Sequence, residues 1–124
     1  MNILILGAGQ VGSSTATQLA NKEDDEVTVV DIDPDSLEKL SGVADLRVIE
    51  GNASHPETLE RAGAESADIL IAVTSSDEVN MVACQVASSL FNTQTKIARI
   101  RASEYTDRPG LFSENEVPVD FTIR

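Results

Sequence analysis

The amino-acid sequence predicts an α/β fold, a doubly wound parallel sheet of about six strands with helices on both faces. Three observations support this prediction. Short apolar runs alternate with helical patterns, which is the order that successive parallel βαβ units require. Aromatic residues make up only 3% of the chain, so the core must be built from Ile, Val, Leu and Ala, as in a sheet covered on both faces. The first apolar run also leads directly into a glycine motif, Gly7, Gly9 and Gly12.

Several segments have the composition of strands. Those at residues 2–6, 26–31, 46–51 and 68–74 are almost continuously apolar, as strands buried on both faces are. Another at residues 95–102 alternates more, and the last, at 120–123, is weaker. Helical patterns lie between them at residues 11–22, 33–40, 54–63 and 75–90, and a further short helix is expected before the last strand.

Polar residues and glycine mark the expected helix ends. Asp33 is a candidate N-cap, Pro34 takes the first helical position, and Gly63 is a candidate stop. Serine and glutamate stand at the spacing of a capping box in two places, which are Ser54 with Glu57 and Ser75 with Glu78.

The helix after Ser75 has the clearest period of the chain. Its only cysteine, Cys84, is expected to be a buried small hydrophobe, and a single cysteine excludes an internal disulfide. Apolar residues recur at helical spacing and predict a core-facing side made of Val79, Val82, Ala83, Val86, Ala87 and Leu90.

The length of 124 residues predicts a single domain, residues 1–124. Because the sequence stops at Arg124, just past the last expected strand, we expect a fragment of a longer chain. No apolar run reaches the ~18 residues of a membrane span, which argues against direct membrane insertion. No signal peptide is recognisable, so a cytoplasmic location is expected. The net charge of −12 disfavours a nucleic acid as partner.

The glycine motif fits a phosphate-binding turn between a strand and a helix. Gly7 permits the tight turn, Gly9 leaves the backbone open to a pyrophosphate, and Gly12 lets the helix pack close to the strand. The N–H groups at the helix start and the helix dipole favour the negative charge of a phosphate. A tight turn without a ligand is the alternative. The whole loop is the candidate cofactor contact: Gly7, Ala8, Gly9, Gln10, Val11 and Gly12.

Asp31 ends the second expected strand 19 positions after Gly12, near the ~20 expected of a ribose-binding acid. Its carboxylate can accept hydrogen bonds from both ribose hydroxyls of NAD and would repel the 2′-phosphate of NADP. Ile32 and Asp33 follow directly and belong to the same candidate site, although Asp33 serves equally well as a helix cap. The motif therefore predicts a Rossmann-like site that prefers NAD(H).

Two further strand ends are expected at the same crevice, because ligands of such sheets lie at the carboxyl ends of the strands. Asn52 and Ala53 follow the third strand and are candidates for lining the adenine. Thr74 and Ser75 follow the fourth strand, next to the point where the strand order reverses. Glu78 is a further candidate, and its alternative role is to stabilise the helix N-terminus, where acidic residues are favoured.

Two arginines, Arg99 and Arg101, are expected on one face of the fifth strand. Their guanidinium groups can reach a ligand phosphate or cross a subunit interface, and salt bridges with the many acids are the equally weighted alternative. Arg101 stands at the carboxyl end of the run. It is therefore the candidate for meeting the γ-phosphate of ATP, in its own subunit or across a dimer.

The residues of a catalytic centre are not evident in the sequence. A dehydrogenase needs a proton donor or acceptor beside the hydride. The single histidine, His55, stands at a helix start, and the single tyrosine, Tyr105, lacks the lysine partner that short-chain dehydrogenases use. These observations favour a nucleotide sensor that is not an enzyme. A fragment of an NAD-dependent oxidoreductase is the alternative.

Together, several stretches of the chain resemble the N-terminal RCK (also called KTN) domains of potassium-transport regulators. They are ILGAGQVG, VTVVDIDPD, residues 46–87, NTQTKIARIRASEY and VPVDFTI. The resemblance runs nearly end to end, and TSSDEVNMVACQVA and KIARIR are far more specific than the glycine motif. It implies a Rossmann-like domain that binds NAD(H), and also ATP or ADP, and that pairs with copies of itself.

The resemblance also implies partners and a location. Full-length subunits of the family carry two such units and form a ring under a membrane-embedded potassium transporter, peripheral at the inner face of the cell membrane. Nucleotide exchange would change the shape of the ring and gate K⁺ flux. The present chain lacks the second unit. The family's glycine motif maps onto Gly7, Gly9 and Gly12, its ribose acid onto Asp31, and its phosphate- or interface-facing arginine onto Arg101.

Overall fold

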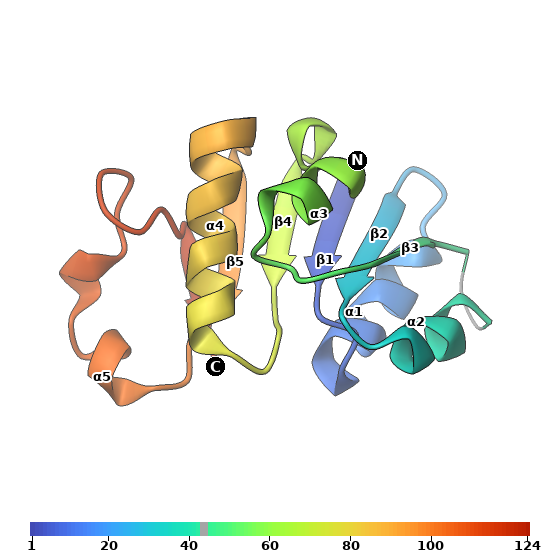
Figure 1. Ribbon diagram of the computed structural model, residues 1–124, viewed down its shortest axis with the longest axis horizontal. Coiled ribbons are helices and arrows are strands. Elements are labelled where there is room, and N and C mark those ends of the chain that lie inside the picture. Colours follow the sequence, from blue (N-terminus) through green and yellow to red (C-terminus); the bar gives the residue numbers. More distant parts are fainter. Residues whose placement is uncertain (43–44) are drawn as a thin grey trace.

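The computed structural model describes residues 1–42 and 45–124 and contains a six-stranded sheet whose strand pairs are all parallel. The strand order β3-β2-β1-β4-β5-β6 reverses direction between β1 and β4, which are neighbours at the centre of the sheet (Figure 1). The predicted fold class, a Rossmann-like doubly wound sheet, is confirmed. The strands are β1 (Asn2–Leu6), β2 (Glu26–Asp31), β3 (Arg47–Glu50), β4 (Ile69–Ala72), β5 (Thr95–Arg99) and β6 (Phe121–Ile123).

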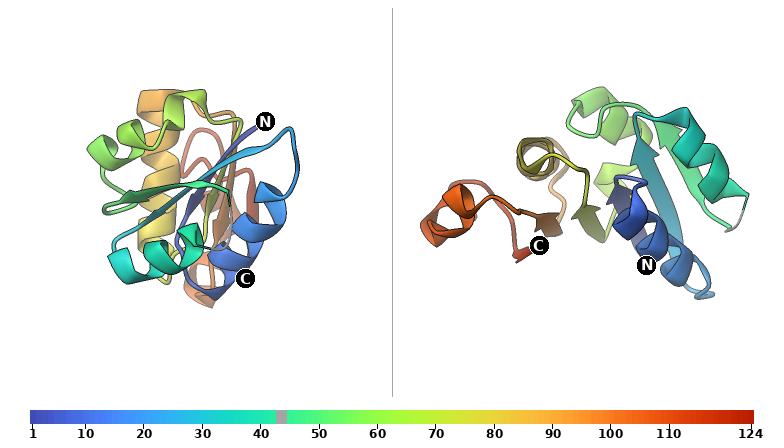
Figure 2. Two further views of the ribbon diagram at one scale, coloured as in Figure 1. Left: turned by 90° about the vertical axis from the view of Figure 1, so that its right-hand side faces the viewer. Right: turned by 90° about the horizontal axis from the view of Figure 1, so that it is seen from below.

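Helices lie on both sides of this sheet (Figure 2). On one side α1 (Gln10–Ala20) and α2 (Pro34–Ser41) pack against β1 and β2. On the other side α3 (Pro56–Arg61) and α4 (Asp77–Phe91) pack against the middle of the sheet. None of the helices in the described ranges is long and apolar enough to cross a bilayer. Three short helices complete the chain: η1 (Ala64–Ser66), α5 (Ser103–Thr106) and η2 (Pro109–Leu111).

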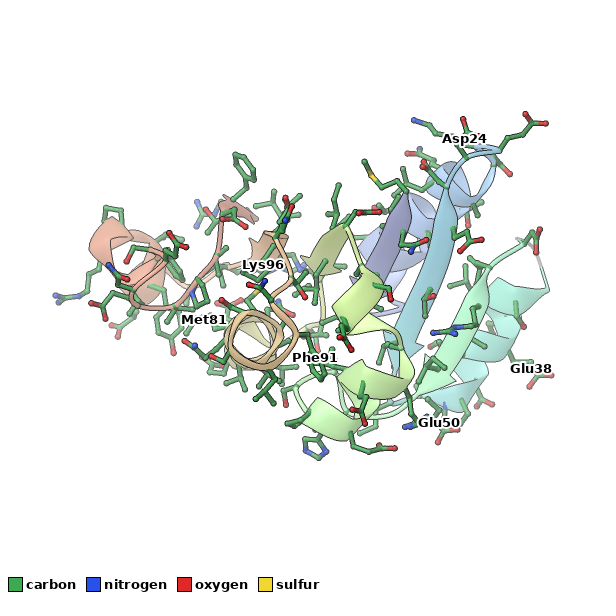
Figure 3. The ribbon with its side chains drawn as sticks, turned by 90° about the horizontal axis from the view of Figure 1, so that it is seen from above. Asp24, Glu38, Glu50, Met81, Phe91 and Lys96 are labelled. Atoms are coloured by element: carbon green, nitrogen blue, oxygen red, sulfur yellow. The ribbon has the colours of Figure 1, made fainter. Side chains whose placement is uncertain are left out.

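The central strand β1 explains why the first apolar run is continuous. Ile3 and Ile5 point into the core under α1 and α2, whereas Leu4 and Leu6 point into the core under α3 and α4. All four side chains are buried. Burial of each such side chain stabilises the fold by about 1.5–3 kcal/mol. Acidic side chains such as Asp24 and Glu38 lie at the rim of the molecule instead and project outward (Figure 3).

Two of the predicted helix ends are confirmed. Asp33 caps α2 by accepting a hydrogen bond from the Asp35 N–H at 3.1 Å, and Pro34 takes the first helical position. Gly63 follows the end of α3 with a positive φ of 85°, which is the left-handed conformation that ends helices.

The two predicted capping boxes are wrong in detail. Helix α3 begins at Pro56, because proline needs no N–H partner there, and the hydroxyl of Ser54 instead donates to Asn52. The N-cap of α4 is Ser76, one residue later than expected, and its Oγ accepts from the Val79 N–H at 3.1 Å.

The predicted core-facing side of α4 is also partly wrong. Val82 and Leu90 are 48% and 62% exposed. Ala83 and Ala87 are buried as predicted, and the other buried positions of the helix are Asn80 and Cys84. The apolar pattern fitted two sides of the helix, and the polar Asn80 takes a core position because its amide is fully hydrogen-bonded there.

Strand β5 ends at Arg99, so the expectation that Arg99 and Arg101 share a strand face is wrong. The carboxylate of Asp77 accepts hydrogen bonds from the backbone N–H groups of Arg101 and Ala102, at 2.8–3.1 Å. These contacts hold the backbone directly after β5. Arg99 is 7% exposed, whereas Arg101 is exposed.

Candidate functional site

A cleft of about 320 Å³ opens at the carboxyl ends of the strands, around the point where the strand order reverses. This is the position at which open parallel sheets bind ligands. Three loops meet there, which follow β1, β3 and β4, together with the ends of β2 and β5. The lining residues are Gly7, Gly9, Val30, Asp31, Ile32, Gly51, Asn52, Ala53, Val73, Thr74, Ser75, Ser76, Val79 and Arg99.

The three glycines of the motif have different structural environments. Gly7 has a φ of 112°, and a Cβ there would lie 2.8 Å from the Val73 carbonyl oxygen. A Cβ on Gly12 would lie 1.8 Å from the carbonyl oxygen of Gly7, so the helix could not approach the strand. A Cβ on Gly9 would meet nothing within 4 Å. Gly7 and Gly12 are therefore required by packing, whereas the open space at Gly9 leaves room for a ligand.

The start of α1 is suited to an anion. Gly9 is its N-cap and has no side chain to bond the N–H groups of the first turn, and that turn carries no acid. Unsatisfied N–H groups together with the helix dipole attract negative charge. Gly9 borders the cleft, so a phosphate can approach these groups.

Asp31 joins two of the loops around the cleft. One carboxylate oxygen accepts from the Ala8 N–H at 2.7 Å, and the other accepts from the Asp33 N–H at 2.8 Å. Each oxygen retains a further lone pair for a hydroxyl donor. The carboxylate is therefore oriented by the backbone before any ligand arrives.

On the far side of the cleft, the loop after β4 is held by buried polar groups. Asn80 is fully buried and bonds to both the N–H and the carbonyl of Thr74, at 2.9 and 3.2 Å. Arg99 donates to the carbonyl oxygens of Val73 and Thr74, both at 2.9 Å. Burial lowers the pKa of Arg99, and the neighbouring charge of Arg101 lowers it further, while Asp77 raises it.

The loop after β3 contributes Gly51, Asn52 and Ala53 to the lining of the cleft. Asn52 accepts from the N–H and the hydroxyl of Ser54, at 2.9 and 2.8 Å, and this turn presents Ala53 to the core. A Cβ on Gly51 would lie 2.7 Å from Thr58 Oγ1, so close packing of α3 requires this glycine.

The structure brings part of the predicted site together. The predicted residues that line the cleft are Gly7, Gly9, Asp31, Ile32, Asn52, Ala53, Thr74 and Ser75. The predicted residues outside its lining are Ala8, Gln10, Val11, Gly12, Asp33, Glu78 and Arg101.

Glu78, one of the predicted residues outside the lining, bonds to another part of the chain. The carboxylate of Glu78 accepts from the Tyr105 hydroxyl at 2.8 Å, which ties α5 to the start of α4. Arg99, rather than Arg101, reaches the cleft. Asn80, Ser76 and Gly51 were not among the predicted site residues. A lone asparagine in the apolar stretch VNMVACQVA is the sequence signal that points to Asn80.

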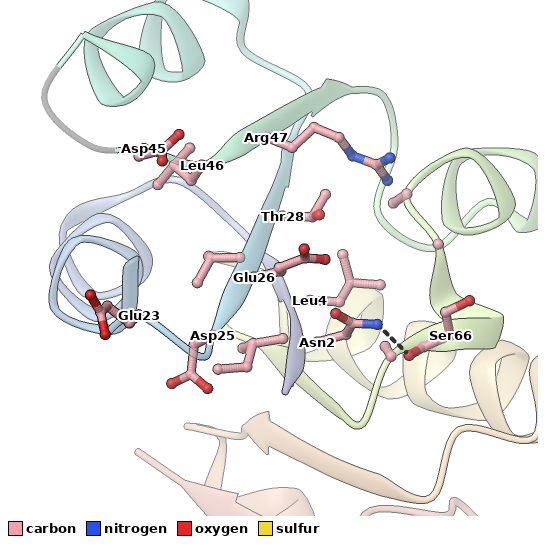
Figure 4. Close-up of a pocket in the computed structure, with 15 residues that line it drawn as sticks. Asn2, Leu4, Glu23, Asp25, Glu26, Thr28, Asp45, Leu46, Arg47 and Ser66 are labelled. Atoms are coloured by element: carbon pink, nitrogen blue, oxygen red, sulfur yellow. Dashed lines mark hydrogen bonds between the residues drawn. The ribbon is translucent and has the colours of Figure 1, made fainter. Parts of the chain in front are cut away.

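A larger hollow, about 730 Å³, lies at the opposite end of the strands, around Asn2, Glu26 and Arg47 (Figure 4). Its polar groups bond to neighbouring backbone: Asn2 donates to the Ser66 carbonyl at 3.2 Å, and Arg47 donates to that of Arg61 at 3.1 Å. The amino ends of parallel strands are not where such sheets bind ligands, so we assign the function to the cleft.

The family of the chain follows from comparison with known proteins. Residues 3–112 match the model of the TrkA-N domain. The chain belongs to the TrkA-N domain family. It is 55% identical over 123 residues to the Trk system potassium uptake protein TrkA of Halomonas elongata, a match that covers 99% of the chain and 27% of that relative. The chain thus spans about a quarter of the length of this curated relative.

Two solved structures have the same fold as this chain. The TrkA-N domain of the inner membrane protein ybaL from Escherichia coli superposes with a TM-score of 0.82 at 22% identity, covering 98% of this chain and 85% of that one. The GsuK channel bound to NAD superposes with a TM-score of 0.79 at 20% identity, covering 98% of this chain and 21% of that one. At these identities the likeness establishes the fold.

Proposed function

We propose that this chain is a nucleotide-binding regulatory domain of a potassium uptake transporter, with NAD(H) as a ligand of the cleft and ATP or ADP as further ligands. The observation that carries the proposal is the pairing of open space at Gly9 with the oriented carboxylate of Asp31. One accommodates a pyrophosphate and the other a ribose. A structural neighbour, the GsuK channel, was solved with NAD bound.

Each part of the ligand has a candidate contact in this proposal. The pyrophosphate lies against Gly9 and the N–H groups at the start of α1. The ribose hydroxyls donate to Asp31, beside Ile32, and the adenine lies near Asn52 and Ala53. The loop that contains Thr74 and Ser75 borders the other half of the ligand. Ala8, Gln10, Val11, Gly12, Asp33 and Glu78 support the surrounding loops.

Arg101 is exposed and lies outside the cleft lining. It therefore remains a candidate for a ligand phosphate or for a neighbouring subunit.

We further propose the partners of the whole subunit. The name of the Halomonas elongata relative places that protein in potassium uptake. By extension, this chain forms the N-terminal part of a longer cytoplasmic subunit, peripheral at the inner face of the cell membrane. Copies pair into dimers that assemble into a ring on the membrane-embedded Trk transporter subunit. Nucleotide exchange changes this assembly and gates K⁺ flux.

Calorimetric titration of the protein with NAD, NADH, NADP, ADP and ATP tests the binding proposal. We expect saturable binding of NAD(H) and ADP and weaker binding of NADP. Absence of binding by all five ligands would contradict the proposal. Incubation with NADH and a panel of carbonyl compounds tests the alternative, because enzymatic loss of NADH would indicate an oxidoreductase fragment instead of a regulator.

A further inference from the structure

A single peptide group on the rim of the cleft, between Val73 and Thr74, is held at both of its polar atoms by buried side chains. Its carbonyl oxygen accepts from Arg99 Nη2 at 2.9 Å. Its N–H donates to Asn80 Oδ1 at 2.9 Å. The same two side chains also bond to the next carbonyl, that of Thr74, at 2.9 and 3.2 Å. The conformation of this loop therefore depends on two residues outside it, Asn80 of α4 and Arg99 of β5.

The two side chains are themselves linked. Asn80 Nδ2 donates to the backbone carbonyl of Arg99 at 2.8 Å. Asn80 Oδ1 also accepts from the Thr74 hydroxyl at 2.7 Å, so the amide is satisfied on both sides. Helix α4, the end of β5 and the loop after β4 are thus joined in one buried network. We call Arg99 and Asn80 the loop clamp.

The clamped peptide lies directly against the glycine loop. A Cβ on Gly7 would be 2.8 Å from the Val73 oxygen and 2.9 Å from the Thr74 nitrogen. Movement of this peptide by a few tenths of an ångström would therefore change the gap between the first glycine and the loop after β4. Gly7, Val73 and Thr74 all line the cleft.

Arg99 carries a cost that a purely structural residue would avoid. Its side chain is 7% exposed, it forms no ion pair with an acid in the described part of the chain, and its partners are neutral carbonyls. Its Nε has no hydrogen-bond partner and is the only such buried side-chain N or O atom among the described residues. Burial of a charge without a counter-charge is unfavourable, so an apolar residue would stabilise the fold better.

From this geometry we infer that Arg99 and Asn80 are positioning residues, which set the Val73–Thr74 peptide against Gly7 and so hold the cleft at the width its ligand needs. The inference rests on the proposed function for its ligand. It differs from a phosphate-binding role, since Arg99 Nη2 donates to two carbonyls of the protein itself. A lysine would keep the charge, but its ammonium group stands one bond closer to the backbone than Nη2 and would fall short of both carbonyls.

Arg99→Lys and Arg99→Gln test this inference, with Arg108→Gln as the charge-matched control because Arg108 is exposed. We expect amide hydrogen exchange at residues 73–76 to be about tenfold faster or more in both Arg99 variants without ligand, as for the loss of charge-assisted hydrogen bonds. Exchange in β1 and β4 should stay slow, which separates loop release from global unfolding. The control should leave all of these rates unchanged.

Affinities for AMP, ADP and ATP provide the second measurement. A positioning role predicts that both Arg99 variants weaken the three ligands by the same factor, about tenfold, and that Asn80→Ala adds little to Arg99→Gln. The inference is overturned if lysine restores the affinity, or if the loss grows with the number of phosphates. Unchanged loop exchange would also overturn it. If the wild-type protein binds none of the three ligands and neither NAD nor NADH, the proposed function fails, while the exchange rates still decide the positioning role.

Discussion

Gly9→Ala should separate ligand binding from stability in this domain. Gly9 has a φ of −73° and a ψ of −164°, a backbone conformation that alanine adopts readily. A Cβ at this position would find no heavy atom within 4 Å. The substitution therefore introduces a methyl group into empty space beside the start of α1. That space is where the proposed pyrophosphate lies.

The expected change in the free energy of unfolding is small, because two effects oppose each other. Loss of unfolded-state freedom on replacing glycine with alanine stabilises by about 0.4–1 kcal/mol. Alanine is a poorer N-cap than glycine, which costs about 1 kcal/mol. We expect a net change within about 1 kcal/mol. The methyl group should weaken NAD binding by about 1–3 kcal/mol, or roughly 5- to 150-fold, as overpacking does.

Urea denaturation and calorimetric titration with NAD measure the two quantities on one preparation. Gly12→Ala is the matched comparison. Its Cβ would lie 1.8 Å from the Gly7 carbonyl oxygen, so α1 must move away from β1 at a cost of about 3 kcal/mol or more. Wild-type NAD affinity in Gly9→Ala would refute the reasoning, since the phosphates would then lie elsewhere. A large loss of stability in Gly9→Ala would show that its surroundings are not open.

Three further predictions concern single side chains. Asp31→Asn should weaken NAD binding by about 1–3 kcal/mol and lower the free energy of unfolding by about 1 kcal/mol. The reason is that the single amide oxygen cannot accept hydrogen bonds from both Ala8 and Asp33. Calorimetry measures the first effect and denaturation the second. The pKa of Tyr105 is raised first by its hydrogen bond to Glu78 and second by the negative charge of Glu78. The hydrogen bond therefore persists below pH ~10 and is lost as the pH rises through the raised pKa. Absorbance titration of this only tyrosine should show Glu78→Gln bringing the pKa back toward its ordinary value. Burial raises the pKa of Cys84 to about 12, while the charge of Lys96 acts to lower this pKa and that of Asp120 to raise it. A thiol reagent at pH 8 should therefore react with Cys84 only after denaturant unfolds the chain.

Most of the fold could be predicted from the sequence because strands at the centre of the sheet, β1 above all, are buried on both faces. Continuous apolar runs such as residues 2–6 identify such strands without knowledge of their neighbours. The side of α4 that faces the core could not be chosen in the same way. Valines and alanines occur on more than one of its sides, and the choice depends on the hydrogen bonds of Asn80 to the loop after β4 and to β5. Those partners are known only once the strands are arranged.

The residues of the candidate site fall into the same two groups, those set by local sequence and those set by contacts between distant segments. Gly7, Gly9 and Asp31 could be predicted because their spacing reflects one local strand–turn–helix unit. Arg99 lines the cleft and Arg101 lies outside its lining, where Asp77 binds the backbone after β5, so the phosphate role of Arg101 stays a prediction. That contact joins residues far apart in the sequence. A pattern read along one segment does not contain it.

The proposed preference for NAD over NADP rests on Asp31 and its surroundings. The carboxylate is fixed by two backbone N–H groups, so it cannot swing away from an incoming 2′-phosphate without losing both bonds. A negative charge placed 4 Å from it would be repelled by about 1 kcal/mol in water and about 4 kcal/mol at the effective dielectric constant near a protein surface. The nearby carboxylate of Asp33 is itself engaged at the start of α2 and adds charge of the same sign. A hydrogen bond that the charged 2′-phosphate gains elsewhere in the loop is worth about 1.5–3 kcal/mol. The repulsion near the protein surface exceeds the gain from one such bond. The preference for NAD should weaken as salt is added, because screening acts on the repulsion and less on the ribose hydrogen bonds.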